Sequence, residues 1–402
     1  MISCLPMWRR FGAALAALVL ASAFAPSFAQ TPKKDDSFQI SATRVILIDA
    51  DSGTVLYEKA ADELMEPSSM AKLKTVEVVF NALRQGRVKP DDEFIISENA
   101  WRRGGAPSHG STMYAAIHSR VKVIDLLQGA IIQSGNDACI ALAEGLAGSE
   151  LAFADMMTKR ARELGLTQST FANSNGLPDP RTRVTARELA KLAQHIIRTY
   201  PDYYRFFGER EFTWNKIRQF NRNPLLALNI GADGMKTGFT KEAGYGLAAS
   251  ATQNGLRLIA VTNGFRTAKE RADETKKLLE WGFKGFESRL LFAEGQIIGD
   301  AKLFGGARGH VPLVAGAPVR LLVPRNATDR ILARVVYTGP VPAPVEKDQR
   351  IGMLKVLRGN NVVLEVPLRA RDTVARGSLT QRAIDAASEL VIGLLRAGVQ
   401  KL

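Results

Sequence analysis

The order of strand and helix patterns constrains the fold of this chain more than any other feature. Two strand patterns, "TRVILIDA" and "TVLYEKA", lie within residues 40–59. Helical patterns dominate from 67 to about 200. Strand patterns return after 232, where "GYGLAASAT" and "LRLIAVTNG" surround Asn254-Gly255, a strong hairpin signal. Because strands bury their apolar face only against other elements, the early and late strands must close one sheet on which the helices pack. The sequence therefore predicts an α+β layer architecture.

The last third of the chain has a different pattern, and we expect a separate domain there. Four short strand patterns occur, "PVRLLVP", "ILARVVYT", "GMLKVLR" and "VVLEVPL", with proline and glycine between them. They predict a small all-β domain over residues 286–378. The final segment, 379–402, has a helical pattern in which Ile384, Ala387 and Val391 form an apolar stripe. We expect an amphipathic helix whose charges are incompatible with a transmembrane span.

The first 29 residues have the layout of a secretory signal peptide. Arg9 and Arg10 precede the apolar run "FGAALAALVLASAFA", and small residues surround a possible cleavage site before Gln30. We expect residues 1–29 to be removed on export, with an uncleaved anchor as the alternative, and the main domain to cover residues 30–285. The chain carries a formal net charge of +14 and stays basic without the two arginines. A basic exported protein is attracted to anionic lipid or cell-wall polymer, and no nucleic-acid-binding motif is present, which argues against nucleic acid as a partner.

Cysteine and histidine usage indicates neither a disulfide nor a metal site. Cys4 lies within the expected signal peptide, which leaves Cys139 alone as a small buried helix residue. The four histidines show no H-E-x-x-H motif or other ligand-like spacing, and the chain has neither a P-loop nor a dinucleotide fingerprint. We expect no metal and no cofactor.

The stretch "EPSSMAKLKT", residues 66–75, contains two lysines at different positions of an expected helix over 68–85. One stripe of this helix is otherwise apolar and contains Ser69, Lys72, Val76, Val79 and Leu83. The opposite stripe is polar, is interpreted as the solvated face, and contains Lys74, Glu77, Asn81 and Arg84. Lys74 is accordingly expected to be a surface lysine that can pair with Glu77.

The position of Lys72 beside Ser69 permits a catalytic pair. A lysine normally titrates near ~10.4 and is no base at neutral pH, but desolvation or a second cation lowers its pKa. A neutral Lys72 can accept the hydroxyl proton of Ser69 and make it a nucleophile. Free N–H groups at the helix start can stabilise an oxyanion. The S-x-x-K pattern is common by chance, however, and on its own it favours a snorkelling lysine and a capping serine.

Two further short motifs carry polar groups suited to the same chemistry. "QSGNDA" places Ser134 and Asn136 between two helical segments, where a hydroxyl can relay a proton and an amide can hold a peptide carbonyl. "DGMKTGFT" places Lys236, Thr237 and Gly238 at the opening of a strand, where lysine can hold a carboxylate and glycine leaves room for a substrate backbone. Taken singly, these motifs favour a helix cap and a surface strand lysine.

The three motifs in this order, in an exported protein, indicate a known family. S-x-x-K, S-x-N and K-T-G, with the flanks "IIQSGNDA", "SNGLPD" and "DGMKTGFT", resemble the low-molecular-mass penicillin-binding proteins that are serine-type D-alanyl-D-alanine carboxypeptidases. The resemblance is strong over residues 40–265 and weaker through the β-domain. It implies a penicillin-binding, β-lactamase-like catalytic domain with an antiparallel sheet and a helical cluster. It also implies a periplasmic protein attached peripherally to the outer face of the cytoplasmic membrane through residues 379–402.

The resemblance implies a role for each motif residue. Ser69 would attack the peptide bond between two D-alanines of a peptidoglycan stem peptide and form an acyl-enzyme, with Lys72 as general base. Ser134 would pass the proton to the leaving D-alanine, and Asn136 would orient the penultimate residue. β-Lactam antibiotics would acylate Ser69 by mimicking the same dipeptide.

The K-T-G strand would hold the other end of the substrate. Lys236 and Thr237 would bind the terminal carboxylate with Gly238 beside them, and the backbone N–H of Phe239 would complete the oxyanion hole with that of the nucleophile. Lys236 would also be the second cation that leaves Lys72 largely neutral. Phe239 stands where the family often has histidine, which puts substrate preference and the rate of deacylation in question.

Three alternatives stay open on the sequence. A class A β-lactamase would need a glutamate in an E-x-x-L-N context before the K-T-G strand, and no such string occurs between 137 and 235. A peptidoglycan endopeptidase of the same fold would cut a D-alanyl cross-link, although its shorter members commonly lack the β-domain. A non-catalytic cell-wall-binding protein would keep the fold around a relic site, and the three intact motifs argue against it.

Overall fold

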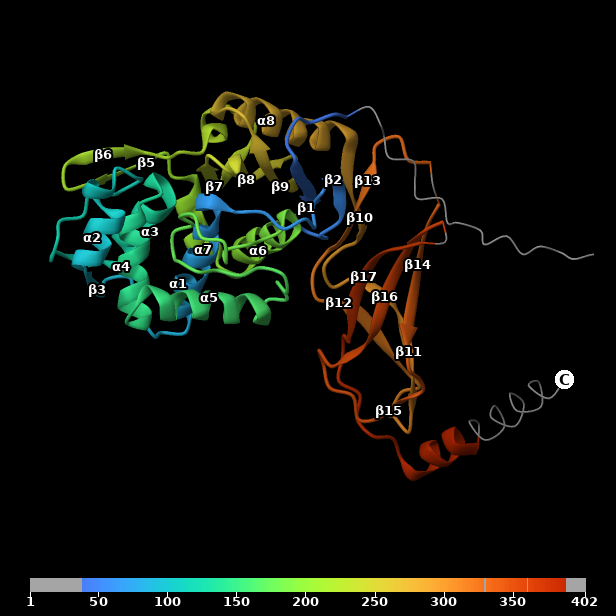
Figure 1. Cartoon of the computed structure of the whole chain (residues 1–402). Helices are drawn as coiled ribbons and strands as arrows, with labels where there is room; N and C mark the ends of the chain where they lie inside the picture. The colour runs from blue at the N-terminus through green and yellow to red at the C-terminus, as the bar shows by residue number, and fades with distance from the viewer. Residues whose placement is uncertain (1–37, 329, 360, 388–402) are drawn as a thin grey trace, which may run out of the picture. The chain divides into compact units, whose positions relative to one another are not determined.

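The computed structural model describes residues 38–328, 330–359 and 361–387 (Figure 1). The expected signal peptide and residues 388–402 of the expected C-terminal helix lie outside this part of the chain. Within it, an α+β domain is followed by a β-domain, which confirms the predicted fold class.

One five-stranded antiparallel sheet forms the centre of the first domain. Its strand order is β2-β1-β9-β8-β7, so the first two strands of the chain join the last three of the domain. β1 pairs with β9 in a register that aligns Val45 with Thr262. The strands are β1 (Arg44–Asp49), β2 (Val55–Lys59), β7 (Ala232–Thr240), β8 (Gly244–Gln253) and β9 (Leu256–Phe265). The early and late strand patterns therefore close one sheet, as predicted.

A two-residue turn joins β8 to β9. Asn254 and Gly255 both have a left-handed backbone, with φ of 49° and 76°. A tight hairpin turn requires this conformation, and asparagine and glycine adopt it most readily. The turn confirms the predicted hairpin, and the strand order leaves β7, which carries the K-T-G residues, at the edge of the sheet.

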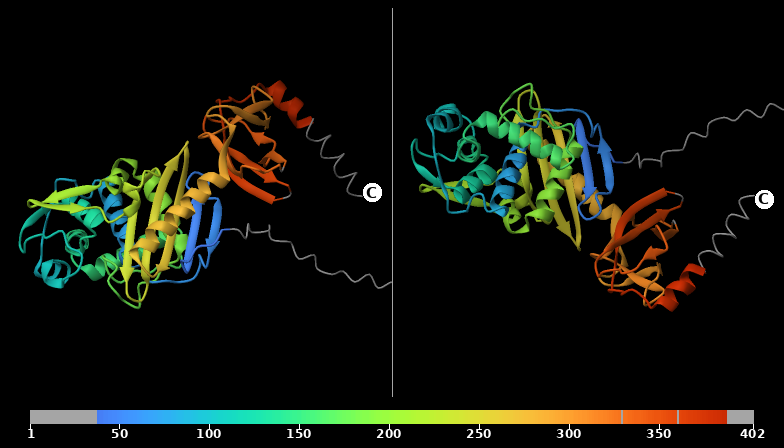
Figure 2. Two further views of the ribbon diagram at one scale, coloured as in Figure 1. Left: turned by 90° about the horizontal axis from the view of Figure 1, so that it is seen from above. Right: turned by 90° about the horizontal axis from the view of Figure 1, so that it is seen from below.

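Helices cover both faces of the sheet (Figure 2). α8 packs on one face, and α6 and the helical segment containing Ser69 pack on the other. The α-helices are α1 (Lys72–Arg84), α2 (Glu98–Gly104), α3 (Val123–Gln128), α4 (Asn136–Ala147), α5 (Glu150–Glu163), α6 (Ala186–Thr199), α7 (Pro201–Tyr204) and α8 (Ala268–Gly285). The sequence did not predict α8, because its exposed residues are so densely charged that the apolar stripe around Leu278, Leu279 and Phe283 is narrow.

Short elements complete the first domain. They are the 3₁₀ helices η1 (Ser68–Ala71), η2 (Ala106–Ser108), η4 (Arg205–Gly208) and η5 (Pro224–Ala227), the π-helical turn η3 (Gly129–Gln133), and the strand pairs β3 (Glu93–Ile95) with β4 (Arg120–Lys122) and β5 (Glu211–Trp214) with β6 (Ile217–Phe220). The helix expected over 68–85 is thus a 3₁₀ turn, η1, that continues directly into α1.

The polar stripe of α1 is buried, which corrects the prediction of a solvated face. Lys74 and Glu77 are both 0% exposed, and Lys74 Nζ lies 2.5 Å from Glu77 Oε2. Arg160 Nε and the Tyr200 hydroxyl each lie 3.2 Å from Glu77 Oε1. Helices α4, α5 and α6 pack around α1, so this stripe faces charged partners rather than water. It becomes fully exposed only at Arg84, in the last turn.

The second domain has its own strands and its own apolar core. The strands are β10 (Phe286–Phe292), β11 (Ile297–Phe304), β12 (His310–Ala315), β13 (Val319–Pro324), β14 (Ile331–Tyr337), β15 (Val341–Pro342), β16 (Arg350–Arg358) and β17 (Asn361–Ala370). β10 pairs with β13, and the other six form a sheet in the order β14-β16-β17-β12-β11-β15. Leu313, Leu354 and Leu368 lie in the core between them. Residues 379–387, the described part of the expected C-terminal helix, are helical.

Candidate active site

The start of the helix brings Ser69 and Lys72 together. Lys72 Nζ lies 3.0 Å from Ser69 Oγ, 2.8 Å from Asn136 Oδ1 and 2.6 Å from the carbonyl oxygen of Asn175. Lys72 is 0% exposed, whereas Ser69 is partly exposed. As a cation, Lys72 donates to all three oxygens. As a neutral amine, it can still donate to Asn136 and Asn175 while presenting its lone pair to the Ser69 hydroxyl.

Burial sets the proton affinity of Lys72. It lowers the pKa of Lys72 from 10.5 to about 8; Cys139 and Asp137 oppose this shift, and the positive charge of Arg222 adds to it. Arg222 is thus a cation near Lys72 that the sequence did not indicate. This lowered pKa brings the neutral amine that the general-base role requires closer to neutral pH. Burial lowers the pKa of Lys236 as well, and there Lys72 is the first of the cations that add to the effect.

Ser134 lies at a left-handed bend between η3 and α4, with φ of 63°. Its side chain lines the same cavity as Ser69. The hydroxyl is buried and has no hydrogen-bond partner among the described residues. An unpaired buried hydroxyl costs roughly 1–3 kcal/mol, so a substrate group that bonds to it would relieve this cost.

Asp137 binds the turn formed by residues 134–136 to the loop that contains Ser111, Thr112 and Met113. Its carboxylate accepts hydrogen bonds from Thr112 Oγ1 at 2.6 Å and from the backbone N–H of Met113 at 2.9 Å. The backbone N–H of Asn136 donates to the carbonyl oxygen of Ser111 at 2.7 Å. These bonds hold Asn136 where its Oδ1 accepts a hydrogen bond from the amine of Lys72.

The "SNG" part of the "SNGLPD" motif supplies another partner of Lys72. Asn175 Nδ2 and Ser174 Oγ donate to Glu150 Oε1 at 3.2 Å and 2.9 Å. The other carboxylate oxygen of Glu150 lies 3.2 Å from Arg103. This network holds the Asn175 carbonyl against Lys72, a role that the motif did not indicate in the sequence.

The K-T-G residues lie inside β7 rather than at its opening. Lys236 is buried, and its Nζ donates to the carbonyl oxygen of Thr237 at 3.2 Å. Gly238 faces the chain that leads to Ser69, since a Cβ there would lie 2.9 Å from the carbonyl oxygen of Pro67. The close contact between β7 and η1 therefore requires glycine at this position.

A cavity of about 400 Å³ lies in front of Ser69. Its wall consists of Ser69, Ser111, Ser134, Arg222, Thr237, Gly238, Phe239, Tyr245, Ala268 and Arg271. Phe239 stacks on Tyr245 with ring centroids 4.1 Å apart, and the Arg271 guanidinium lies 5.6 Å from the Tyr245 ring. Lys72, Asn136 and Lys236 lie behind this wall.

Two arginines in this wall were missed in the sequence. Arg222 comes from the loop between β6 and η5, and Arg271 comes from α8, the helix that was not predicted. Burial lowers the pKa of Arg271, and its Nε has no hydrogen-bond partner among the described residues. Neither arginine belongs to a motif, so only the assembled fold reveals them.

Within residues 38–328, 330–359 and 361–387, no group of three or more His, Cys, Asp and Glu side chains is placed to hold a metal ion. None of the helices in these ranges has the length and the apolar character of a membrane span.

Two family models match most of the chain. The model described as D-alanyl-D-alanine carboxypeptidase matches residues 28–267. The chain belongs to the D-alanyl-D-alanine carboxypeptidase family. The carboxypeptidase also matches, over residues 286–376, the model of the C-terminal domain of penicillin-binding protein 5.

Named relatives of the carboxypeptidase cover nearly its whole length. It is 38% identical to D-alanyl-D-alanine carboxypeptidase DacC of Escherichia coli (strain K12), over 90% of this chain and 91% of that protein. It is 39% identical to D-alanyl-D-alanine carboxypeptidase DacA of Haemophilus influenzae, over 84% of this chain and 86% of that protein. These matches confirm the predicted family and enzyme class, a hydrolase of the cell wall.

Solved structures of penicillin-binding proteins share the fold of the carboxypeptidase. Penicillin binding protein 5 from Haemophilus influenzae has a TM-score of 0.76 at 37% identity, and the match covers 84% of this chain and 99% of that one. Penicillin-binding protein D2 from Listeria monocytogenes in the ampicillin-bound form has a TM-score of 0.56 at 29% identity, covering 61% of this chain and 99% of that one.

Proposed function

We propose that the carboxypeptidase removes the terminal D-alanine from pentapeptide stems through an acyl-enzyme on Ser69. The observation that carries this proposal is the 3.0 Å contact between Ser69 Oγ and the buried amine of Lys72, beside an open cavity of about 400 Å³. This pair supplies both a nucleophile and a base whose pKa is lowered by burial.

Acylation begins with transfer of the Ser69 proton to the neutral form of Lys72. The serine oxygen attacks the carbonyl carbon between the two D-alanines, whose oxygen is held by the backbone N–H groups of Ser69 and Phe239. Ser134 passes the proton from Lys72 to the leaving nitrogen, and Asn136 orients the penultimate residue. Water then cleaves the ester, with Lys72 again as the base. A β-lactam follows the first step and remains on Ser69.

One hydroxyl and two guanidinium groups in the cavity wall hold the terminal carboxylate. The Thr237 side chain lines the wall together with Arg222 and Arg271, so these three groups make the direct contacts. Lys236 lies behind them and contributes its field, and a bound carboxylate raises the pKa that burial has lowered there. Gly238 keeps the edge strand close to η1, which sets the distance between the carboxylate site and Ser69.

Release of free D-alanine tests this function most directly. The protein is incubated with a pentapeptide that ends in D-Ala-D-Ala and, separately, with a cross-linked muropeptide dimer, and the products are separated by chromatography. We expect D-alanine from the pentapeptide and slower cleavage of the dimer. The Ser69→Ala control should release nothing and should not react with fluorescent penicillin. Equal labelling of this variant and the wild type would refute the assignment of the nucleophile.

The same assay also tests the second candidate activity, which is cleavage of cross-links by a peptidoglycan endopeptidase. Faster cleavage of the dimer than of the pentapeptide would favour it. The match of residues 286–376 to a C-terminal domain model supports the carboxypeptidase instead, because the shorter endopeptidases that the chain resembles commonly lack this domain. A non-catalytic wall-binding protein would show neither activity.

We infer that residues 1–29 direct export and are removed. Residues 30–285 would then be the catalytic domain, 286–378 the β-domain, and 379–402 an anchor on the outer face of the cytoplasmic membrane in the periplasm. The layout of the N-terminal segment supports export. Leu379 is exposed at the start of the final helix, as expected for a helix that buries an apolar face in a lipid surface.

Deleting residues 379–402 is expected to move the protein from the membrane fraction to the soluble fraction, with D-alanine release intact. The measurement is fractionation by ultracentrifugation followed by the peptide assay. Full-length protein washed with high salt is the control, because salt weakens electrostatic attraction but leaves apolar insertion. Unchanged membrane association of the deletion variant would contradict the anchor.

A further inference from the structure

A buried carboxylate is connected to the amine of Lys72 through a single residue. Glu150 lies in the first turn of α5 and is 9% exposed. Its Oε1 accepts hydrogen bonds from Asn175 Nδ2 at 3.2 Å and from Ser174 Oγ at 2.9 Å. The carbonyl oxygen of the same Asn175 accepts a hydrogen bond from Lys72 Nζ at 2.6 Å. The side chain of Asn175 is thus held by Glu150 while its backbone contacts Lys72.

The loop of residues 173–177 is held from three sides. On α1, Thr75 Oγ1 donates to the carbonyl oxygen of Ser174 at 2.5 Å. Against η1, Gly176 has φ of 76°, and a Cβ there would lie 1.9 Å from the carbonyl oxygen of Ser68. On α5, the carboxylate of Glu150 binds two side chains of the loop. Of these three contacts, the one with Glu150 holds Asn175 directly.

The hydrogen bonds of a neutral Lys72 decide where its lone pair points. A neutral amine has two N–H groups and one lone pair. Asn136 Oδ1 and the Asn175 carbonyl oxygen lie 2.8 Å and 2.6 Å from the amine and can take the two N–H groups. The lone pair is then left for Ser69 Oγ at 3.0 Å. Without the Asn175 carbonyl, the amine could rotate about its Cε–Nζ bond and turn an N–H toward the hydroxyl instead.

The same carbonyl affects how strongly Lys72 holds its proton. Burial lowers the pKa of Lys72, and the charge of Glu150 opposes this shift. A hydrogen bond to a carbonyl oxygen is stronger from an ammonium than from an amine, so the Asn175 carbonyl also opposes it. Removing Glu150 should therefore lower the pKa of Lys72 further, while the lone pair loses its direction.

We propose that Glu150 is a positioning residue for the general base. By fixing the Asn175 carbonyl, it points the lone pair of neutral Lys72 at the Ser69 hydroxyl. Glu150 does not line the catalytic cavity, so it acts through Asn175 and not through contact with the substrate. The inference rests on the proposed function, because it requires Lys72 to take the proton of Ser69.

Two variants of Glu150 test this role. Glutamine keeps an oxygen that can accept from Ser174 and Asn175, whereas alanine keeps none. The first-order rate constant of Ser69 acylation is measured with saturating fluorescent penicillin between about pH 6 and 10. In Glu150→Ala we expect the plateau at high pH to fall roughly 10–100-fold. The midpoint of the pH profile should move down by roughly half a unit to one unit. Glu150→Gln should keep most of the wild-type plateau, with a smaller shift of the midpoint.

The rate constant separates positioning from loss of the fold. It is read from the time course of labelling, so unfolded molecules lower the amount of labelled protein but not the rate constant. Asn175→Ala removes the other side chain of the contact and should reproduce both changes. It takes the place of Glu150→Ala if that variant does not unfold cooperatively.

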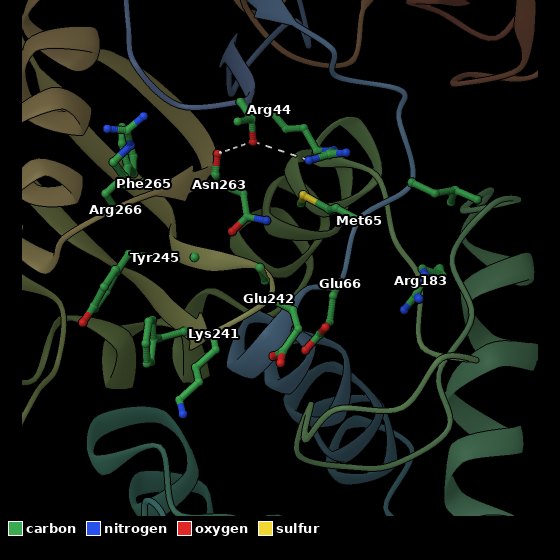
Figure 3. Close-up of a pocket in the computed structure, with 16 residues that line it drawn as sticks. Arg44, Met65, Glu66, Arg183, Lys241, Glu242, Tyr245, Asn263, Phe265 and Arg266 are labelled. Atoms are coloured by element: carbon green, nitrogen blue, oxygen red, sulfur yellow. Dashed lines mark hydrogen bonds between the residues drawn. The ribbon is translucent and has the colours of Figure 1, made fainter.

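Glu242→Gln is the matched control for loss of a carboxylate near the catalytic centre. Glu242 is exposed and lines a cavity of about 820 Å³ that shares Phe239 and Tyr245 with the catalytic one (Figure 3). This variant should keep the wild-type plateau and midpoint.

Three outcomes would overturn the inference. A plateau and a midpoint in Glu150→Ala and Asn175→Ala that match the wild type would overturn the positioning role alone. An equally low plateau in Glu150→Gln would also overturn it, because the effect would then come from the charge and not from the contact with Asn175. A wild-type rate that does not rise with pH would overturn the general base itself, and the positioning role with it.

Discussion

A Lys72→Arg variant is expected to acylate Ser69 roughly 10²–10⁴-fold more slowly than the wild type. The guanidinium stays protonated at every working pH, so it cannot take the serine proton. It still offers N–H donors to Asn136 and Asn175, the two oxygens that the lysine amine bonds in addition to Ser69. The rate is measured by labelling with fluorescent penicillin. Normal labelling of the variant would overturn the assignment of Lys72 as the general base.

Two further variants separate loss of the base from loss of the fold. Lys72→Met has a neutral side chain of similar length and should be equally slow. Lys191→Arg lies on the exposed side of α6 and should label like the wild type. Because Lys72 is 0% exposed, thermal unfolding must show that the larger guanidinium is accommodated. Slow labelling supports the assignment only when the variant still unfolds cooperatively.

The same base predicts how acylation depends on pH. Burial lowers the pKa of Lys72 to about 8, and only the neutral amine can accept the proton. The rate should therefore rise about tenfold per pH unit below that value and level off above it. The Lys72→Arg variant should lack this rise. A wild-type rate that is flat between about pH 6 and 9 would argue against a base of this pKa.

Replacing Glu77 by glutamine is expected to lower the free energy of unfolding by about 3–5 kcal/mol. The change removes the counter-ion of Lys74, and both side chains are 0% exposed. Burial alone would raise the pKa of Glu77, but His195 Nε2, 3.3 Å from Glu77 Oε1, and the charge of Lys74 hold that pKa at about 2. The depressed pKa means that this stability is fully present above the unfolded-state value of ~4.3 and is lost as the pH falls through about 2. Urea unfolding at neutral pH measures the loss.

Two controls show whether the buried charge is the cause. Glu163→Gln removes the exposed partner of Arg160, and it should cost no more than about 1 kcal/mol. The double variant Lys74→Met, Glu77→Gln should recover most of the loss, because no uncompensated charge remains in the core. A double variant as unstable as Glu77→Gln alone would show that another contact of Glu77 carries the effect.

Local patterns in the sequence were sufficient to predict much of the fold. The hairpin around Asn254 and Gly255 and the pairing of early with late strands follow from short alternating runs and one turn signal. α8 escaped prediction because charged residues occupy most of its surface. The polar stripe with Lys74 was wrongly predicted to face solvent for a related reason. Helical period tells which residues share a face, but it does not tell what packs against that face.

The candidate site likewise contains residues that the sequence could indicate and residues that it could not. The motif residues Ser69, Lys72 and Ser134 could be found because each lies in a short local pattern. Arg222 and Arg271 could not be found, since they reach the cavity only through tertiary packing. The sequence also could not decide whether desolvation or a second cation contributes more to the lowered pKa of Lys72. The main cause is desolvation, which depends on the whole surroundings of the side chain.

Because β1 pairs with β9, the first domain can become active only after both of these distant strands are available to fold. Val45 and Thr262 are partners in the sheet although most of the first domain lies between them. Pairings between such distant segments form late, because a long loop must close first. Under the export proposed above, β1 becomes available well before β9, so the sheet would stay open until the whole domain has crossed. Until then Lys72 would be hydrated and protonated, and Ser69 would lack the proposed base. We therefore expect penicillin labelling to begin only when folding of the first domain is complete.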